Sequence, residues 1–236
     1  MRFCPGSKAL CSKVLEEKEI FATLFFLFDT DTPYPIVLNS FFMTNEVVLD
    51  IETQNTFADV GGYDPKKLKI SVIGVYFYES DEYLAYEEQE LPKLWNRLEK
   101  SGRIIGYNTN HFDLPVMNSY YAGDFLTFPG LDILEEIQKA IGFRIKLDDV
   151  AAATVGVHKS GHGLQAIEWW KQGEMEKIKK YCLDDVKITK AVYEYGLKYN
   201  ALAYEDRFSG RKAIPVNFYP KQDGQKGPSI NLTMPL

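Results

Sequence analysis

The sequence predicts an α/β fold in which a mixed β-sheet is flanked by helices. Two apolar segments, at 47–51 and 69–78, come early in the chain and are rich in the β-branched and aromatic residues that favour strands. Segments with the three- and four-residue spacing of helices follow and dominate the second half. Strands that come first and then alternate with helices are typical of the α/β class.

The first of these strands is expected at the centre of the sheet. The run at 47–51 is apolar except for Asp50, which is typical of a strand that is buried on both faces. Turn-forming pairs separate the segments, such as Gly61-Gly62 after the first strand. Strands are expected, in chain order, at 47–51, 69–78, 83–86, 103–107, 202–207 and 213–219, the last two as a closing hairpin.

The helices are expected mainly after residue 90. The segment that ends at Ser101-Gly102 has a stop signal typical of a helix C-terminus. Pro115 is acceptable in the first turn of the helix that opens at Leu114. Helices are expected at 91–100, from 114 onward, and at 133–141, 148–155, 163–172 and 174–199.

The charge balance argues against one class of partner. The chain carries 27 Lys and Arg against 33 Asp and Glu, a formal net charge of −6. Proteins that wrap duplex nucleic acid by charge attraction have strongly basic surfaces, which this composition does not favour. A nuclease remains compatible with it, because bound divalent cations invert the sign of the local field.

The N-terminal segment and the cysteines give further expectations. Residues 1–42 show no regular alternation of turn and strand patterns. We expect them to be an extension of the domain at 43–236, with Met43 as the natural start. The apolar run Ile20 to Phe28 is too short to span a bilayer. Three cysteines cannot form a disulfide framework and have no zinc-type spacing. We therefore expect a reduced, cytoplasmic protein without a membrane partner.

Two carboxylates stand where a buried strand should be apolar. The side chains of Asp50 and Glu52 point to the same face of the strand. Two ionised carboxylates in a buried strand cost several kcal/mol each if they are unpaired, so a cation is expected beside them. Because no Lys or Arg is near in sequence, Mg²⁺ or Mn²⁺ is the natural candidate. The alternative is that Asp50 ends the strand and that Glu52 is solvated.

Two more segments place acids at structured positions. Asp113 follows a strand and opens a helix, where an N-cap is the simpler interpretation, and Asn108 fits an ordinary turn. In the long helix, Asp185 falls within the apolar stripe whereas Asp184 lies off it, so Asp185 should point inward. Tyr181 lies one turn earlier on the same side. The alternative is that Tyr181 is an ordinary tyrosine at the edge of the core and that Asp184 and Asp185 form a solvated turn of the helix.

Together these residues resemble the DEDD group of 3′–5′ exonucleases within the ribonuclease H-like superfamily. The first motif, D-x-E, stands at 50–52, and the second, an Asn ahead of Phe-Asp, stands at Asn108 with Phe112-Asp113. The third motif, Y-x-x-x-D, stands at Tyr181 and Asp185. The stretch GYNTNHFDLP is similar to the proofreading exonuclease of family B DNA polymerases, and residues 159–172 leading to YCLDDV are similar to the YprB-type group.

The resemblance covers residues 43–199 and also indicates a branch. Relatives of the histidine type have a His five residues before the last Asp, where this chain has Lys180. The tyrosine branch, abbreviated DEDDy, is therefore the better match.

The resemblance implies two-metal hydrolysis of phosphodiester bonds, with Mg²⁺ or Mn²⁺ as cofactor. It implies that Asp50 bridges both ions, that Glu52 and Asp185 complete the first, and that Asp113 holds the second through water. It assigns Tyr181 to orienting the attacking water, because a phenol with a pKa near 10 is a poor base. Residues expected to meet the nucleic acid are Thr53, Gln54, Asn108, Phe112 and Lys159.

The implied substrate is the 3′ end of single-stranded DNA or RNA. A polymerase or helicase acting in trans stays open as a partner. Two other functions also stay open: a catalytically silent nucleic-acid-binding module on the same fold, and a structure-specific endonuclease.

Overall fold

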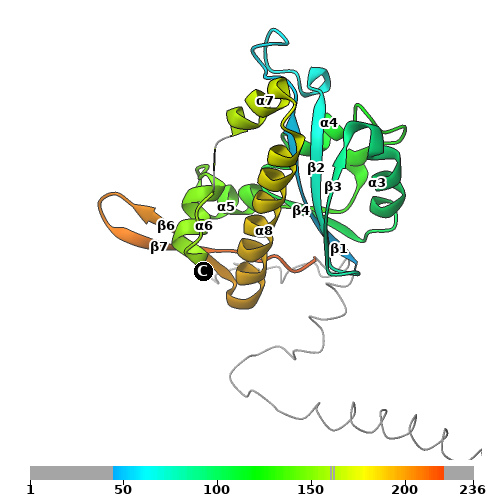
Figure 1. Ribbon diagram of the computed structural model, residues 1–236. Coiled ribbons are helices and arrows are strands. Elements are labelled where there is room, and N and C mark those ends of the chain that lie inside the picture. The colour runs from blue at the N-terminus through cyan, green and yellow to red at the C-terminus, as the bar shows by residue number, and fades with distance from the viewer. Residues whose placement is uncertain (1–44, 160, 162, 221–236) are drawn as a thin grey trace, which may run out of the picture. The chain divides into compact units, whose positions relative to one another are not determined.

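A five-stranded mixed sheet lies between two layers of helices in the computed structural model, which describes residues 45–159, 161 and 163–220 (Figure 1). The expected N-terminal extension, 1–42, lies outside the described residues, and the domain boundaries stay a prediction. The strands of the main sheet are β1 (Glu46–Thr53), β2 (Ile70–Phe77), β3 (Glu82–Glu87), β4 (Arg103–Gly106) and β5 (Gly130–Asp132).

The order of the sheet is β3-β2-β1-β4-β5, which places β1 at its centre, as predicted. β1 runs antiparallel to β2 and parallel to β4, and β5 runs parallel to β4. The mixed sheet expected from the sequence is confirmed.

Helices cover both faces of this sheet. The helices are α3 (Leu91–Leu98), α4 (Asp113–Met117), α5 (Ile133–Ile141), α6 (Leu147–Val155), α7 (Gly163–Gln172) and α8 (Met175–Tyr199). α3 and α4 pack on one face, where Val47, Leu49 and Ile51 of β1 point. α5, α6 and α8 pack on the other, where Val48 points. The strand therefore alternates between two cores, and Asp50 and Glu52 share the face of Val48.

A two-stranded hairpin follows α8. β6 (Ala201–Asp206) pairs antiparallel with β7 (Gly210–Pro215). The side chains of Leu202 and Ile214 are buried in the core that α6 and α8 form, so the base of the hairpin packs against these helices. Figure 1 shows its tip projecting beyond α6.

The close approach of α8 to the sheet depends on a glycine. Gly74 of β2 lies opposite Asp50 in the strand register. A Cβ atom at this position would lie 2.9 Å from Sγ of Cys182 in α8. The same sulfur lies 3.1 Å from the amide nitrogen of Gly74 and 3.3 Å from the carbonyl oxygen of Asp50. The helix that carries Asp185 is thus seated directly on the strands beside Asp50.

The structure differs from the sequence-based expectations at two short elements. β5 was not expected, because a strand of three residues shows no alternation that a sequence pattern can reveal. The helix expected from Leu114 onward begins at Asp113 and has only five residues. Among the described residues, no helix is both long enough and apolar enough to cross a membrane.

We predict that Gly74→Ala lowers the free energy of unfolding by about 1–3 kcal/mol, because the added methyl group pushes α8 away from the sheet. The matched control is Gly130→Ala in β5, where the nearest atom to an added Cβ lies at an ordinary 3.5 Å. Urea unfolding of both variants measures the difference. An equal effect of the two substitutions would contradict the role given to Gly74.

Candidate active site

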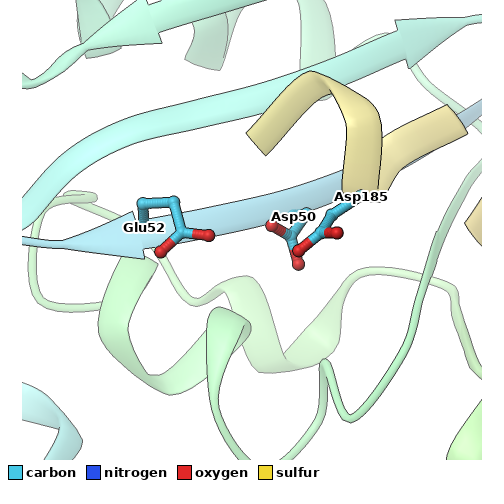
Figure 2. A group of neighbouring side chains, drawn as sticks. All are labelled: Asp50, Glu52 and Asp185. Atoms are coloured by element: carbon cyan, nitrogen blue, oxygen red, sulfur yellow. The ribbon is translucent and has the colours of Figure 1, made fainter. Parts of the chain in front are cut away.

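Three carboxylates from two distant segments meet on the α8 face of the sheet. Asp50 and Glu52 come from β1, and Asp185 comes from the buried face of α8. One carboxylate oxygen from each lies within 4.8 Å of the others. Figure 2 shows the carboxylate of Asp185 beside that of Asp50, with Glu52 further along the same strand. The group is arranged so that all three could hold one metal ion.

The alternative interpretation of β1, in which Asp50 ends the strand and Glu52 is solvated, is wrong. β1 continues through Thr53, and the side chain of Glu52 is buried. The prediction for the long helix is confirmed, since Asp185 is buried whereas Asp184 forms surface ion pairs with Lys180 and Lys187.

The three carboxylates disfavour one another's ionised forms. Burial, followed by the charge of Asp185, raises the pKa of Glu52 to about 8. Burial and the charges of Asp185 and Glu52 raise the pKa of Asp50 well above its usual range. Burial also raises the pKa of Asp185. Its Oδ1 atom is buried without a hydrogen-bond partner among the described residues. The cluster thus contains an oxygen that the described side chains leave unsatisfied.

Lys159 is the cation that the fold places beside this cluster. Its Nζ atom lies 2.6 Å from Oδ2 of Asp185. Burial lowers the pKa of Lys159, but the charges of Asp50 and Asp185 outweigh this and hold it above the ordinary value. The ammonium group therefore stays charged. One positive charge against three carboxylates leaves a charge of −2 when all are ionised.

Asp113 is buried next to the group of three but is not a member of it. Its Oδ1 accepts a hydrogen bond of 3.1 Å from the backbone N–H of Ile51, between Asp50 and Glu52. Burial raises the pKa of Asp113 to about 7, and the charge of Asp132 acts in the same direction, whereas the hydrogen bond from Ile51 and the charge of Lys159 act against it. The N-cap interpretation is wrong, because Phe112 occupies the N-cap position and the carboxylate of Asp113 reaches β1 instead. Its role as a metal ligand stays a prediction.

Asn108 and Gln54 have structural partners. The backbone of Asn108 is in the left-handed region at φ 67°, and its side-chain oxygen accepts a hydrogen bond from Arg144. The side chain of Gln54 donates to the carbonyl of Ile70 at 2.7 Å and to Glu88 at 2.8 Å. These two side chains hold loops that adjoin the cluster, and their contact with nucleic acid stays a prediction.

Asp132 is a supporting residue that the sequence-based interpretation missed. Its carboxylate accepts hydrogen bonds from the backbone N–H groups of Asn108 and Asn110. It also accepts from the first turn of α5, which makes it the N-cap of that helix. The sequence signal was available, because Asp132 followed by Glu135 resembles a capping box.

The carboxylates open onto a cavity of about 420 Å³. This volume falls in the usual range of small-ligand sites. Of the residues predicted from the sequence, the cavity is lined by Asp50, Glu52, Thr53, Phe112, Lys159, Tyr181 and Asp185. Gln54, Asn108 and Asp113 are absent from the described lining. Phe57 and Phe112 form an apolar wall of the cavity, with their ring centroids 5.9 Å apart. The role of Phe57 could not be predicted from the sequence, because its loop has no periodic pattern.

Tyr181 stands at the edge of the cluster as a protonated phenol. Its hydroxyl lies 3.4 Å from the carbonyl oxygen of Gly161, to which it donates. Burial, followed by the charge of Asp185, raises the pKa of Tyr181 above its usual range. The hydroxyl can therefore donate a hydrogen bond but cannot act as a base near neutral pH.

Comparison with known families places this geometry in context. A family model described as RNase_H superfamily matches residues 47–196, which include all three carboxylates of the cluster. The chain belongs to the ribonuclease H superfamily. The five-stranded mixed sheet described above is the ribonuclease H-like fold expected from the sequence.

Among solved structures, this superfamily member is similar to the family B DNA polymerase from the hyperthermophilic archaeon Pyrobaculum calidifontis. The match has a TM-score of 0.50 and 18% sequence identity, and it covers 64% of this chain and 24% of the polymerase. The likeness concerns the fold and spans about a quarter of that protein. No curated protein matches the chain.

We predict that the metal-free protein loses stability as the pH rises from about 5 to 8. Glu52 has a pKa of about 8 in the folded protein against an ordinary 4.5, so the folded state keeps a proton that the unfolded state has lost. In this interval the loss is about 1.4 kcal/mol per pH unit for one such group. Urea unfolding in EDTA at pH 6 and pH 8 measures it.

Glu52→Gln should make this pH dependence less steep. The matched control is Glu176→Gln, because the side chain of Glu176 is 88% exposed and lies far along α8 from the buried cluster. Stability that is equal at pH 6 and pH 8 in the wild-type protein would contradict the prediction.

Proposed function

We propose that the chain is a metal-dependent 3′–5′ exonuclease that removes nucleotides from single-stranded DNA or RNA. The observation that supports it is the convergence of Asp50, Glu52 and Asp185 beside a cavity of about 420 Å³. The superfamily match supports a nuclease, and the tyrosine-branch motif supports the direction of cleavage.

The residues present fit a divalent cation. The three donors are carboxylate oxygens, which Mg²⁺ and Mn²⁺ prefer, and Oδ1 of Asp185 is buried without a described hydrogen-bond partner. Asp50, Glu52 and Asp185 would hold one ion, and Asp113 with Asp50 would hold a second. Bound divalent ions supply an activated water and stabilise charge on the phosphate.

The other side chains would position the reacting groups. Tyr181 keeps its proton, so its hydroxyl would orient the attacking water through a hydrogen bond rather than deprotonate it. Lys159 would contact a phosphate oxygen, because its ammonium group lines the cavity beside the carboxylates. Thr53 and Phe112 line the same cavity and would contact the terminal nucleotide.

The proposal extends to the setting in which the enzyme works. The polymerase match covers 24% of that protein, so its polymerase activity is not carried over to this chain. A polymerase or helicase in trans and a cytoplasmic location remain parts of the proposal that follow from the resemblance and the composition.

We predict that the protein shortens a labelled single strand only when its 3′ end is free. Matched DNA and RNA strands, with either the 3′ or the 5′ end blocked, are incubated with Mg²⁺ or Mn²⁺ and separated on a denaturing gel. Shortening only from a free 3′ end supports the proposal. Internal cleavage of the strand whichever end is blocked would indicate an endonuclease. Absence of cleavage would indicate a binding module.

Substitutions at one turn of α8 provide the matched control. Asp185→Asn should reduce the rate at least about a hundredfold, because it removes the charge of a ligand from the cluster. Asp184→Asn should stay within about twofold of the wild type, since Asp184 pairs with surface lysines. Equal damage by both substitutions would contradict the assignment.

A further inference from the structure

A second cavity, of about 510 Å³, lies between the β6–β7 hairpin and the segment that joins α5 to α6. We define the hairpin groove by six of its lining residues, Phe143, Arg144, Lys146, Tyr204, Arg207 and Phe208. None of them belongs to the carboxylate cluster or lines its cavity. We propose that the hairpin groove binds the part of a single nucleic-acid strand that lies away from the cleaved end. This inference rests on the proposed function.

Exposed aromatic rings are the first feature that supports the proposal. Phe208, at the tip of the hairpin, is 98% exposed, and Phe143 is 47% exposed. Phe143 contacts Tyr204 edge-on at 5.7 Å, which fixes its ring on the wall of the groove. Large exposed aromatic rings next to cations are the usual platform for stacking unpaired bases.

The charge of this region is opposite to that of the whole chain. Exposed cations at the groove and the hairpin tip are Arg144, Lys146, Arg207, Arg211 and Lys212. Three of these cations, Arg144, Lys146 and Arg207, line the groove and are balanced by three acids, Asp149, Glu205 and Asp206. Arg211 and Lys212 on the adjoining strand β7 bring the charge of the groove and hairpin together to +2. The chain carries −6 in total. A phosphate backbone is the polymer that such a local excess of positive charge attracts.

The carboxylate of Asp206 accepts hydrogen bonds from other residues of the hairpin turn. It accepts hydrogen bonds from the backbone N–H groups of Phe208 and Ser209, at 3.0 and 2.9 Å, and from the hydroxyl of Ser209 at 2.6 Å. These contacts hold the tip in one conformation and present the ring of Phe208 to solvent.

Two short connections join the hairpin groove to the carboxylate cluster. Arg144, in the groove, donates to the side chain of Asn108 in the loop that precedes Asp113. Asp149, also in the groove, follows Asp148, whose carboxylate accepts the backbone N–H of Lys159 at 2.7 Å. Lys159 in turn contacts Asp185. In the proposed binding mode, a strand whose 3′ end lies at the carboxylates would continue past the N-terminus of α6 into the groove.

The test separates strand binding from hydrolysis. Fluorescence anisotropy in EDTA measures the affinity of the full chain for labelled strands of about 20 nucleotides, as DNA and as RNA. The groove variant is Phe208→Ser with Arg207→Ser, because both side chains line the groove and both residues are exposed. The control variant is Leu126→Ser with Lys93→Ser, an exposed pair on the α3 and α4 face of the sheet. Both pairs remove one apolar side chain and one cation.

We predict that the groove variant raises Kd at least about tenfold and that the control stays within about twofold. The dependence of log Kd on log salt should become shallower by about 0.7 for the lost phosphate contact. Hydrolysis of thymidine 5′-(4-nitrophenyl) phosphate with Mn²⁺ should be the same in wild type and groove variant, because this substrate has no second nucleotide to reach the groove.

Equal affinities of the groove and control variants would overturn the proposal. Strand binding that depends on Phe208, together with no hydrolysis of any substrate by the wild-type protein, would support the groove while refuting the exonuclease.

Discussion

Electrostatic repulsion between buried carboxylates is the constraint on which the site depends. One carboxylate oxygen from each of Asp50, Glu52 and Asp185 lies within 4.8 Å of the others; Glu52 and Asp185 are buried and Asp50 is partly buried. Burial raises the pKa of all three, and the charge of Asp185 raises those of Asp50 and Glu52 further. The ammonium group of Lys159 offsets only part of the negative charge. A fold that tolerates this cost at its centre is best explained by a function that needs negative charge there.

The surrounding structure holds the carboxylates together despite that repulsion. Gly74 lets α8 approach β1, Cys182 contacts the backbone of Asp50, and Asp113 accepts the N–H of Ile51. Asp132 organises the loop that leads to Asp113. These contacts are made by the backbone or by buried side chains, so the geometry is fixed before any ligand binds. Such preorganisation is what an enzyme requires of its charged groups.

The sequence predicted the elements whose patterns are long and missed contacts that depend on loops. β1 and α8 have clear strand and helix periodicity, which located Asp50, Glu52 and Asp185 on facing surfaces. The position of Lys159 beside Asp185 could not be predicted, because it depends on the path of the loop between α6 and α7. The hairpin was expected from its turn residues, but the groove beside it requires the three-dimensional packing of β6 against α6.

Titration of the full chain with Mn²⁺ by isothermal calorimetry, without nucleic acid, tests the central claim most directly. The account predicts saturable uptake by the wild-type protein, loss of that uptake in Asp50→Asn, and unchanged uptake in Asp184→Asn. Absence of binding to the wild-type protein, or equal binding by the Asp50→Asn variant, would contradict the claim that these carboxylates form a metal site.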